Sequence, residues 1–150
     1  MSNGEHQYSG ARPGLAEWFA TPQGQYVLDW ERGQFDNASE DVFGYRAVQA
    51  GVPGIDFLRA NRIPFRFTLA LEHGATLAAD PMQLPLANQS VDLVALPHAL
   101  ESTADPHLVL REAERVLIPE GQLVISGFNP LSFWRMRQMF ARKGAGARMS

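Results

Sequence analysis

Polar side chains follow three apolar segments of this 150-residue chain. Asp80 follows the short run at 75–79, His98 comes two residues after the run at 91–96, and Asn129 follows the run at 121–127. A carboxylate accepts hydrogen bonds from amines, and an imidazole can exchange a proton near neutral pH. If these segments are neighbouring strands, the three side chains share one edge of a sheet, where they can bind a polar ligand.

Each of these residues also has a purely structural interpretation. Asp80 precedes Pro81, and Asp-Pro commonly opens a turn, so Asp80 either contacts a ligand or caps its own turn. His98 is either a structural residue or a general base, which makes it a weak catalytic candidate. His98, Asp105 and His107 lack a recognised metal-ligand spacing, so we predict no metal site.

The elements around these residues indicate an α/β sheet. Strands that are apolar on both faces and joined by a helix favour parallel pairing, with both faces covered. In such sheets ligands lie outside the carboxyl ends of the strands. A crossover helix is predicted to open at Asp105-Pro106 and to stop at the turn 119–121. The predicted strands are residues 45–49, 64–71, 75–79, 92–96 and 123–126, with a short helix or turn at 55–60.

Further local signals complete this outline. Thr21-Pro22 predicts a helix start, because a capping hydroxyl precedes proline at the first helical position. Residues 131–142 are expected to form an amphipathic helix. Glu101 is predicted to open a helix, Asp92 to tie down the loop before the fourth strand, and Glu112 to pair with Arg115.

Composition excludes several classes of protein. The chain has no cysteine, so disulfide and thiolate chemistry are absent. No apolar run approaches the roughly 18–20 residues of a membrane span, and the N-terminus does not resemble a secretory signal, so a cytoplasmic protein without membrane contact is expected. Net charge is −3, and five basic residues beyond position 121 favour a solvated face over a nucleic-acid interface. Residues 15–143 are expected to form one domain, with flexible ends at 1–14 and 144–150.

Two motifs in the second half of the chain resemble a known family. Asp80-(x3)-Leu84-Pro85-(x6)-Asp92-Leu93-Val94 is followed by a helix that ends Arg115-Val116-Leu117-(x2)-Glu120-Gly121-Gln122-Leu123-Val124. This spacing resembles class I S-adenosylmethionine-dependent methyltransferases, and most of all a type-11-like, uncharacterised bacterial subgroup. The resemblance implies a Rossmann-like methyltransferase sandwich, a mostly parallel sheet with helices on both faces. It also implies methyl transfer from S-adenosylmethionine to an unidentified small-molecule acceptor.

The resemblance also implies roles for individual residues. The residue that ends the third strand contacts the adenine amino group in this family, which is Asp80 here, with Met82 beside it. The acidic residue that ends the second strand binds the ribose hydroxyls, and Glu72 is the candidate. The methionine end of the cofactor is lined by the residues after the fourth strand, which are Leu96, Pro97 and His98.

The first family motif is altered in this chain. In the family, an acidic strand end precedes a glycine-rich loop whose glycines let the backbone approach the ligand. Here Gln49 takes the acidic position, Gly51 and Gly54 remain in the loop, and Pro53 replaces a middle glycine. Gln49 either contacts the cofactor through its carbonyl or is an ordinary polar strand end. This alteration favours, as an alternative function, a non-catalytic module that binds a nucleoside or a protein.

The end of the chain departs from the family as well. The family fold has seven strands, the last two forming an antiparallel edge. These C-terminal strands are expected to be missing here, because the chain ends after the helix predicted beyond strand five. Strand five would then be an unprotected edge, which a homodimer can cover. Another interpretation is that the chain is a fragment of a longer methyltransferase.

Overall fold

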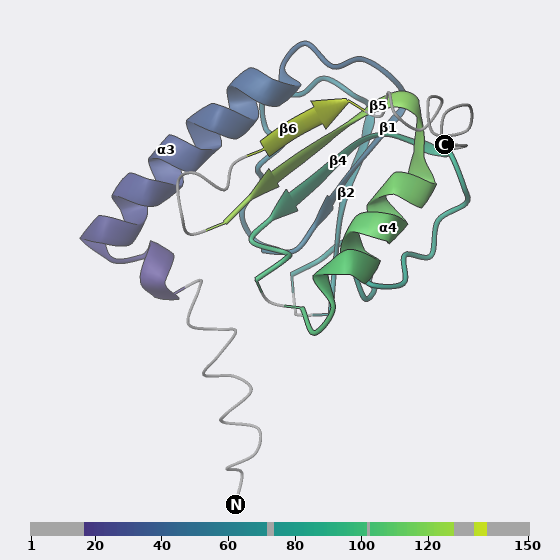
Figure 1. Ribbon diagram of the computed structural model, residues 1–150. Coiled ribbons are helices and arrows are strands. Elements are labelled where there is room, and N and C mark those ends of the chain that lie inside the picture. Colours follow the sequence, from purple (N-terminus) through teal and green to yellow (C-terminus); the bar gives the residue numbers. More distant parts are fainter. Residues whose placement is uncertain (1–16, 72–73, 102, 128–133, 138–150) are drawn as a thin grey trace, which may run out of the picture. The chain divides into compact units, whose positions relative to one another are not determined.

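The computed structural model describes residues 17–71, 74–101, 103–127 and 134–137 (Figure 1). The chain divides into two compact units, residues 1–34 and residues 35–150. Helix α3 (Pro22–Ser39) begins in the first unit, where the hydroxyl of Thr21 accepts a hydrogen bond from the Gly24 amide at 3.0 Å. The predicted helix start at Thr21-Pro22 is therefore confirmed. Within the described ranges, no helix has the length and hydrophobicity needed to cross a bilayer.

The second unit is built on a six-stranded sheet with the order β3-β2-β1-β4-β5-β6. The first five strands pair in parallel, and β6 is antiparallel to β5. This arrangement confirms the predicted α/β class with a mostly parallel, Rossmann-like sheet, and each predicted strand is present. The strands are β1 (Arg46–Ala50), β2 (Phe65–Ala70), β3 (Leu77–Ala78), β4 (Val91–Pro97), β5 (Leu117–Ser126) and β6 (Trp134–Arg137).

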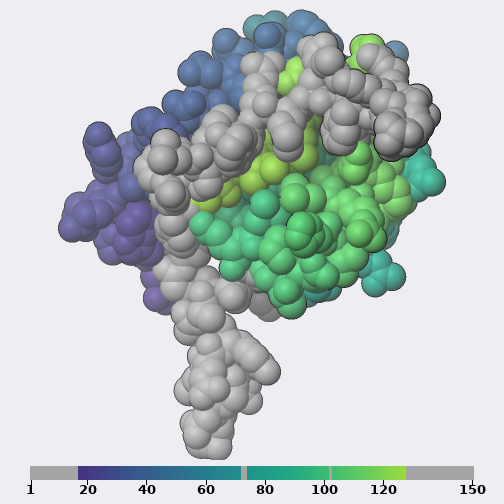
Figure 2. Space-filling model, viewed as in Figure 1, coloured from purple at the N-terminus to yellow at the C-terminus, as the bar shows by residue number. Residues whose placement is uncertain are grey.

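Helix α4 (Pro106–Val116) covers one face of this sheet (Figure 1). As predicted, Asp105 is its N-cap, and the carboxylate accepts hydrogen bonds from the backbone amides of residues 107 and 108. The helix buries Val109, Ala113 and Val116 in a single apolar cluster with residues of β1, β4 and β5. Its outer side forms part of the green surface in Figure 2. Burial of this stripe holds α4 on the sheet.

The carboxylate of Asp92 joins β4 to the start of β1. Its Oδ2 accepts hydrogen bonds from the backbone amides of Tyr45 at 2.8 Å and Arg46 at 3.1 Å. Gly44 precedes these amides, and a Cβ there would lie 2.2 Å from the Asp92 carboxyl carbon, so a side chain at this position would displace the carboxylate. The predicted structural role of Asp92 is confirmed, but the segment that it anchors is the entry to β1.

The connections between β1, β2 and β3 contain no α-helix among their described residues. Residues 51–64 pass from β1 to β2 through turns, so the expected short helix or turn at 55–60 is a turn. This connection packs on the last turn of α3 through the Phe57 and Phe35 rings, whose centroids are 4.9 Å apart. Arg59 adds a 2.9 Å ion pair with Asp36. Side chains thus hold in place a crossover that usually consists of a helix.

Helix α4 ends earlier than the predicted turn at 119–121. Its last residue is Val116, and Leu117 is already extended and pairs with Val91 of β4. Pro119 disfavours the helical conformation at the residue before it, which helps to stop α4 here. The turn predicted at 119–121 is instead part of β5, where Glu120 has a positive φ of 74°. Strand pairing with β4 therefore replaces the last predicted turn of the helix.

The helix predicted at 131–142 is wrong where the structure describes it. Residues Trp134–Arg137 form β6, which pairs with β5 from Gln122 to Ile125. The sequence WRMR alternates apolar and basic residues, and this two-residue period fits a strand as well as a helix. The expectation that strand five lacks a following strand is corrected too, because β6 occupies that edge. The argument for a homodimer that covers this edge no longer applies.

Arg115 and Glu112 of α4 fasten the loop that leads into β4. Arg115 donates to the carbonyl oxygens of Leu84 and Leu86, each at 2.9 Å, while Glu112 accepts from the Leu84 amide at 2.8 Å. The predicted pairing of Glu112 with Arg115 is confirmed at 2.9 Å. The hydrogen bonds from Arg115 hold the pKa of the Glu112 carboxyl below its ordinary value of 4.5, against the opposing effect of burial.

The lowered pKa of Glu112 predicts a loss of stability in acid. A carboxyl whose pKa is depressed in the folded state stabilises the fold above pH 4.5, and this stabilisation disappears as the pH falls through the folded-state pKa. We expect Glu112→Gln to lower the urea midpoint at pH 7, and the gap between variant and wild type to narrow as the pH falls below 4.5. A gap that stays constant from pH 7 to pH 3 would contradict this role of Glu112.

Candidate functional site

The loop after β1 lies against the turn after β4. Gly51 and Gly54 have positive φ angles of 110° and 105°, and Val52 between them has a φ of 45°. A Cβ on Gly51 would lie 3.2 Å from the Pro97 carbonyl oxygen and 3.7 Å from Cβ of Ala99. Glycine is therefore required both by the backbone angle and by this close approach. The structure thus brings together two of the segments that the sequence assigned to the site.

The Gln49 side chain closes this loop from inside. Its Nε2 donates to the carbonyl oxygens of residues 51, 52 and 55 at 3.0, 3.1 and 2.8 Å. Its Oε1 accepts from the Phe57 amide at 2.9 Å, and Gln49 is only 2 % exposed. Both ends of the amide are thus engaged by the backbone of the loop. The geometry describes a structural role that neither interpretation from the sequence had included.

Asp80 forms a tight turn after β3. Its Oδ1 accepts a hydrogen bond from the Met82 amide at 2.9 Å, and its carbonyl accepts from the Gln83 amide at 2.8 Å. The predicted turn is therefore present. Within the described residues, Oδ2 of this half-buried carboxylate has no recorded donor, so it remains available to a ligand. Met82 packs against the apolar cluster under α4.

His98 is fixed at the carboxyl end of β4. The residue has a positive φ of 54°, and its amide donates to the Ser126 carbonyl at the end of β5, at 2.9 Å. Its side chain is 1 % exposed, and Nδ1 lies 2.9 Å from Oε1 of Glu101. Glu101 lies in the turn before α4, so the prediction that it opens a helix is wrong. The contact between His98 and Glu101 was not predicted from the sequence. The spacing of three residues between them, directly after a strand end, could have suggested it.

Ser126 is a second residue that the sequence interpretation missed. It ends β5 beside Pro97 of β4, it is 3 % exposed, and its hydroxyl has no hydrogen-bond partner among the described residues. A buried hydroxyl without a partner is uncommon in folded proteins. Two sequence candidates, Glu72 and Asn129, lie outside the described residues. The described residues contain no group of three or more side chains suited to hold a metal ion.

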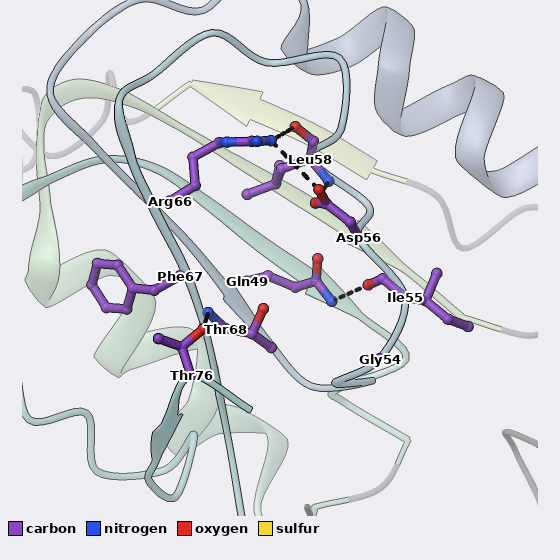
Figure 3. A pocket seen from close by; sticks show the side chains of 9 residues that line it. All are labelled: Gln49, Gly54, Ile55, Asp56, Leu58, Arg66, Phe67, Thr68 and Thr76. Atoms are coloured by element: carbon purple, nitrogen blue, oxygen red, sulfur yellow. Dashed lines mark hydrogen bonds and ion pairs between the residues drawn. The ribbon is translucent and has the colours of Figure 1, made fainter. Parts of the chain in front are cut away.

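A pocket of about 310 Å³ opens beside the crossover from β1 to β2 (Figure 3). At one end, Arg66 donates to the Leu58 carbonyl and lies 3.6 Å from the Asp56 carboxylate. The helix-free crossover leaves this part of the sheet open. Among the predicted cofactor-binding residues that the structure describes, only Gln49 and Gly54 line the pocket. The described lining residues are Gln49, Gly54, Ile55, Asp56, Leu58, Arg66, Phe67, Thr68 and Thr76.

Comparison with protein families decides the affiliation of the chain. The sequence profile of the family described as "Methyltransferase domain" matches residues 50–125. This stretch runs from the end of β1 to the end of β5 and includes the glycine loop, Asp80 and His98. The chain belongs to this methyltransferase family. The resemblance seen in the sequence motifs is thereby confirmed.

Individual relatives match parts of the chain. An uncharacterised protein of Escherichia coli, YafS, is 57% identical over 61 residues, which are 41% of this chain and 25% of that protein. The demethylmenaquinone methyltransferase of Chlamydia pneumoniae is 37% identical over 55% of this chain and 36% of its own length. The UbiE ubiquinone/menaquinone biosynthesis C-methyltransferase of Paracoccus denitrificans is 27% identical over 95% of this chain and 57% of its own length.

Solved structures support the fold. A methyltransferase in complex with the Trm112 activator of Haloferax volcanii has a TM-score of 0.58 at 26% identity, over 74% of this chain and 58% of that one. An S-adenosylmethionine-dependent methyltransferase of Mesorhizobium loti has a TM-score of 0.54 at 24% identity, over 63% and 52%. The alignments of this chain cover between a quarter and slightly more than half of the curated relatives described above.

The two loop glycines allow a matched test of the close approach to Pro97. Gly51→Ala adds a Cβ at 3.2 Å from a backbone oxygen, whereas Gly54→Ala adds one into open space at nearly the same φ. Backbone strain of about 1–3 kcal/mol applies to both variants. We expect the free energy of unfolding, measured by urea titration, to fall further for Gly51→Ala. Equal losses would show that the contact with Pro97 has no energetic effect.

Gln49→Glu tests the closure of the loop. The substitution replaces the amide donor by a carboxylate that faces three carbonyl oxygens. A buried group left without its partners costs about 1–3 kcal/mol, and more when it is charged, so a loss of this size is expected in thermal or urea unfolding at pH 7. Gln23→Glu, at an exposed position of α3, is the control and should change stability by less than about 1 kcal/mol. A similarly small change in stability for Gln49→Glu would refute the conclusion that the Gln49 side chain stabilises the loop after β1.

Proposed function

We propose that the chain transfers a methyl group from S-adenosylmethionine to a small-molecule acceptor. The observation that carries the proposal is the contact between the glycine loop after β1 and the turn after β4, within the stretch that matches the methyltransferase family. Both segments lie at the carboxyl edge of parallel strands, where ligands of α/β sheets bind.

The residues at this edge suit the methyl donor. A loop with positive φ angles at Gly51 and Gly54 exposes backbone without side chains, which lets a ligand approach closely. The open Oδ2 of Asp80 can accept from the adenine amino group, and Met82 offers an apolar contact beside it. The donor supplies an electrophilic methyl group on a sulfonium. Leu96 and Pro97 would line the methionine end of the donor, and Glu72 would bind the ribose.

In this proposal Gln49 maintains the conformation of the glycine loop and does not contact the methyl donor. Because its amide is occupied by four backbone groups, the position that is acidic in the family contributes no charge to the donor here. The same observation favours the second candidate function, a non-catalytic module that binds a nucleoside or a protein. The two functions differ in one property, because only the enzyme transfers a methyl group after the donor binds.

The acceptor is proposed to be a small molecule. Relatives that align with this chain are named as quinone methyltransferases, from Chlamydia pneumoniae and Paracoccus denitrificans. The chain covers 36% and 57% of those proteins, so their substrates support only the general class of acceptor. Aromatic acceptors with hydroxyl groups belong to that class.

Calorimetric titration with S-adenosylhomocysteine tests the donor site. We expect saturable binding near one molecule per chain, and a loss of at least about tenfold in affinity for Asp80→Ala, because that variant removes a charge-assisted hydrogen bond. Asp80→Asn is the matched variant, since its amide oxygen can still accept from the Met82 amide and preserve the turn. The Asp80→Asn variant therefore tests the ligand contact without disrupting the turn, and it should also bind S-adenosylhomocysteine weakly.

Three outcomes of this titration, combined with an assay for transfer of a labelled methyl group, are informative. Full affinity in Asp80→Asn combined with weak binding in Asp80→Ala would reduce Asp80 to a turn residue. Absence of binding to the folded wild-type chain would overturn the methyltransferase proposal. Binding without transfer of a labelled methyl group to any acceptor would favour the non-catalytic module.

A further inference from the structure

We infer that Arg115 and Glu112 are positioning residues of the donor site, and that they set its selectivity for adenine by holding the Asp80 turn in place. The inference rests on the proposed function, in which Oδ2 of Asp80 accepts a hydrogen bond from the adenine amino group. It assigns the selectivity of that contact to two residues of α4. Neither residue contacts the donor, because both act through the backbone of Leu84.

The residue directly after the Asp80 turn is bonded to α4 on both sides. The turn ends at Gln83, whose amide donates to the Asp80 carbonyl at 2.8 Å, and Leu84 follows. The Leu84 amide donates to Oε1 of Glu112 at 2.8 Å, and its carbonyl accepts from Nη2 of Arg115 at 2.9 Å. The buried Leu84 side chain belongs to the apolar cluster under the helix. The end of the turn is therefore fixed to α4.

Arg115 also holds the rest of the loop between the Asp80 turn and β4. Beyond Leu84, its Nη1 donates to the Leu86 carbonyl at 2.9 Å and to Oδ1 of Asn88 at 2.6 Å. The backbone carbonyl of Arg115 accepts from the Gln89 amide at 2.9 Å. One residue of α4 is thus bonded to four positions of the loop. A shift of the loop along the helix would break several of these bonds at once.

The pair that holds the loop is itself fixed in orientation. Nε of Arg115 donates to Oε2 of Glu112 and Nη2 donates to Oε1, both at 2.9 Å. Two parallel hydrogen bonds of this kind define the plane of the guanidinium as well as its position. A lysine carries the same charge as a single point on a flexible stem, so it cannot reach the carboxylate and the loop oxygens in one geometry. The planar fork of Arg115 is therefore required.

The position of the Asp80 carboxylate determines which nucleobase it can bind. This side chain is half-buried, and its Oδ1 is bonded to the Met82 amide, which leaves Oδ2 for the ligand. A carboxylate only accepts hydrogen bonds, so it binds the adenine amino group and repels the carbonyl oxygen that hypoxanthine has at the same ring position. A turn that can move would let the carboxylate reach the neighbouring N1–H of hypoxanthine. Selectivity for adenine therefore depends on a fixed turn.

Calorimetric titration of the full chain with two probes tests this selectivity. S-adenosylhomocysteine carries adenine, and S-inosylhomocysteine carries hypoxanthine in its place. We expect the wild type to bind the adenine probe at least about tenfold more tightly, because only this probe donates an amino proton to the carboxylate. In Arg115→Lys the ratio of the two affinities should fall to about threefold or less. Glu112→Gln keeps an oxygen for the Leu84 amide, so it should lower the ratio by a smaller factor.

Two control variants on α4 separate positioning from general stability. Arg111→Lys makes the same substitution at an exposed position of the helix. Val109→Ala removes buried methyl groups from the apolar stripe and destabilises the helix without removing a bond to the loop. Both controls should keep the wild-type ratio at a temperature where circular dichroism shows every variant to be folded. An unchanged ratio in Arg115→Lys, or an equal fall in Val109→Ala, would overturn the inference.

Amide hydrogen exchange of the ligand-free chain tests the coupling without the donor. The Met82 and Gln83 amides, which close the turn, should exchange about fivefold or more faster in Arg115→Lys than in either control variant, because local opening no longer breaks the bonds to α4. Equal exchange rates would overturn the inference whatever the chain binds. Absence of S-adenosylhomocysteine binding to the wild type would instead overturn the proposed function, and equal wild-type affinities for both probes would overturn the Asp80 contact and the selectivity with it.

Discussion

The structure depends on one side chain that replaces the backbone pairing of a helix. Parallel strands need a crossover, and a helical crossover satisfies its own amides and carbonyls. Between β1 and β2 this chain has turns, so the backbone groups near the sheet must find other partners. The amide of Gln49 provides them, since it donates to three carbonyls and accepts from one amide. The sharp turn at Gly51 is therefore stabilised by the buried side chain of Gln49.

In this arrangement the residue that supports the loop and the residues proposed for the site lie at the ends of different strands. The resemblance in the sequence implied an acidic residue at the position of Gln49, and here the Gln49 side chain maintains the loop. The carboxylate of Asp80 lies elsewhere on the edge, after β3, and His98 lies after β4, where its ring is paired with Glu101. The strand order places β1 next to β4, so the loop and the His98 turn are in contact. Topology rather than sequence proximity assembles the candidate site.

Much of the sheet could be predicted because its signals are local. Apolar runs located β1, β2 and β4 to within one or two residues, and Asp105-Pro106 fixed the start of α4 through capping chemistry. The helix predicted at 131–142 is wrong at the described residues 134–137, because their apolar residues fit two periods and pairing with the edge of β5 selected the shorter one. The role of Gln49 could not be predicted, since it depends on a turn with a positive φ angle at Val52, a residue other than glycine. Such turns leave no periodic pattern in a sequence.

The anchor at Asp92 has a consequence for how the sheet assembles. Its bonds to the amides of Tyr45 and Arg46 span 47 and 46 residues, whereas β2 and β3 pair across a short connection. Contacts between distant residues close a long loop of chain, and their entropic cost is met late unless local structure has formed first. The join between β1 and β4 is thus expected to be the slow step of folding, after β1–β2–β3 and β4–α4–β5 have formed as separate pieces. The carboxylate of Asp92 then acts as the fastening between two halves that can each assemble from neighbouring segments.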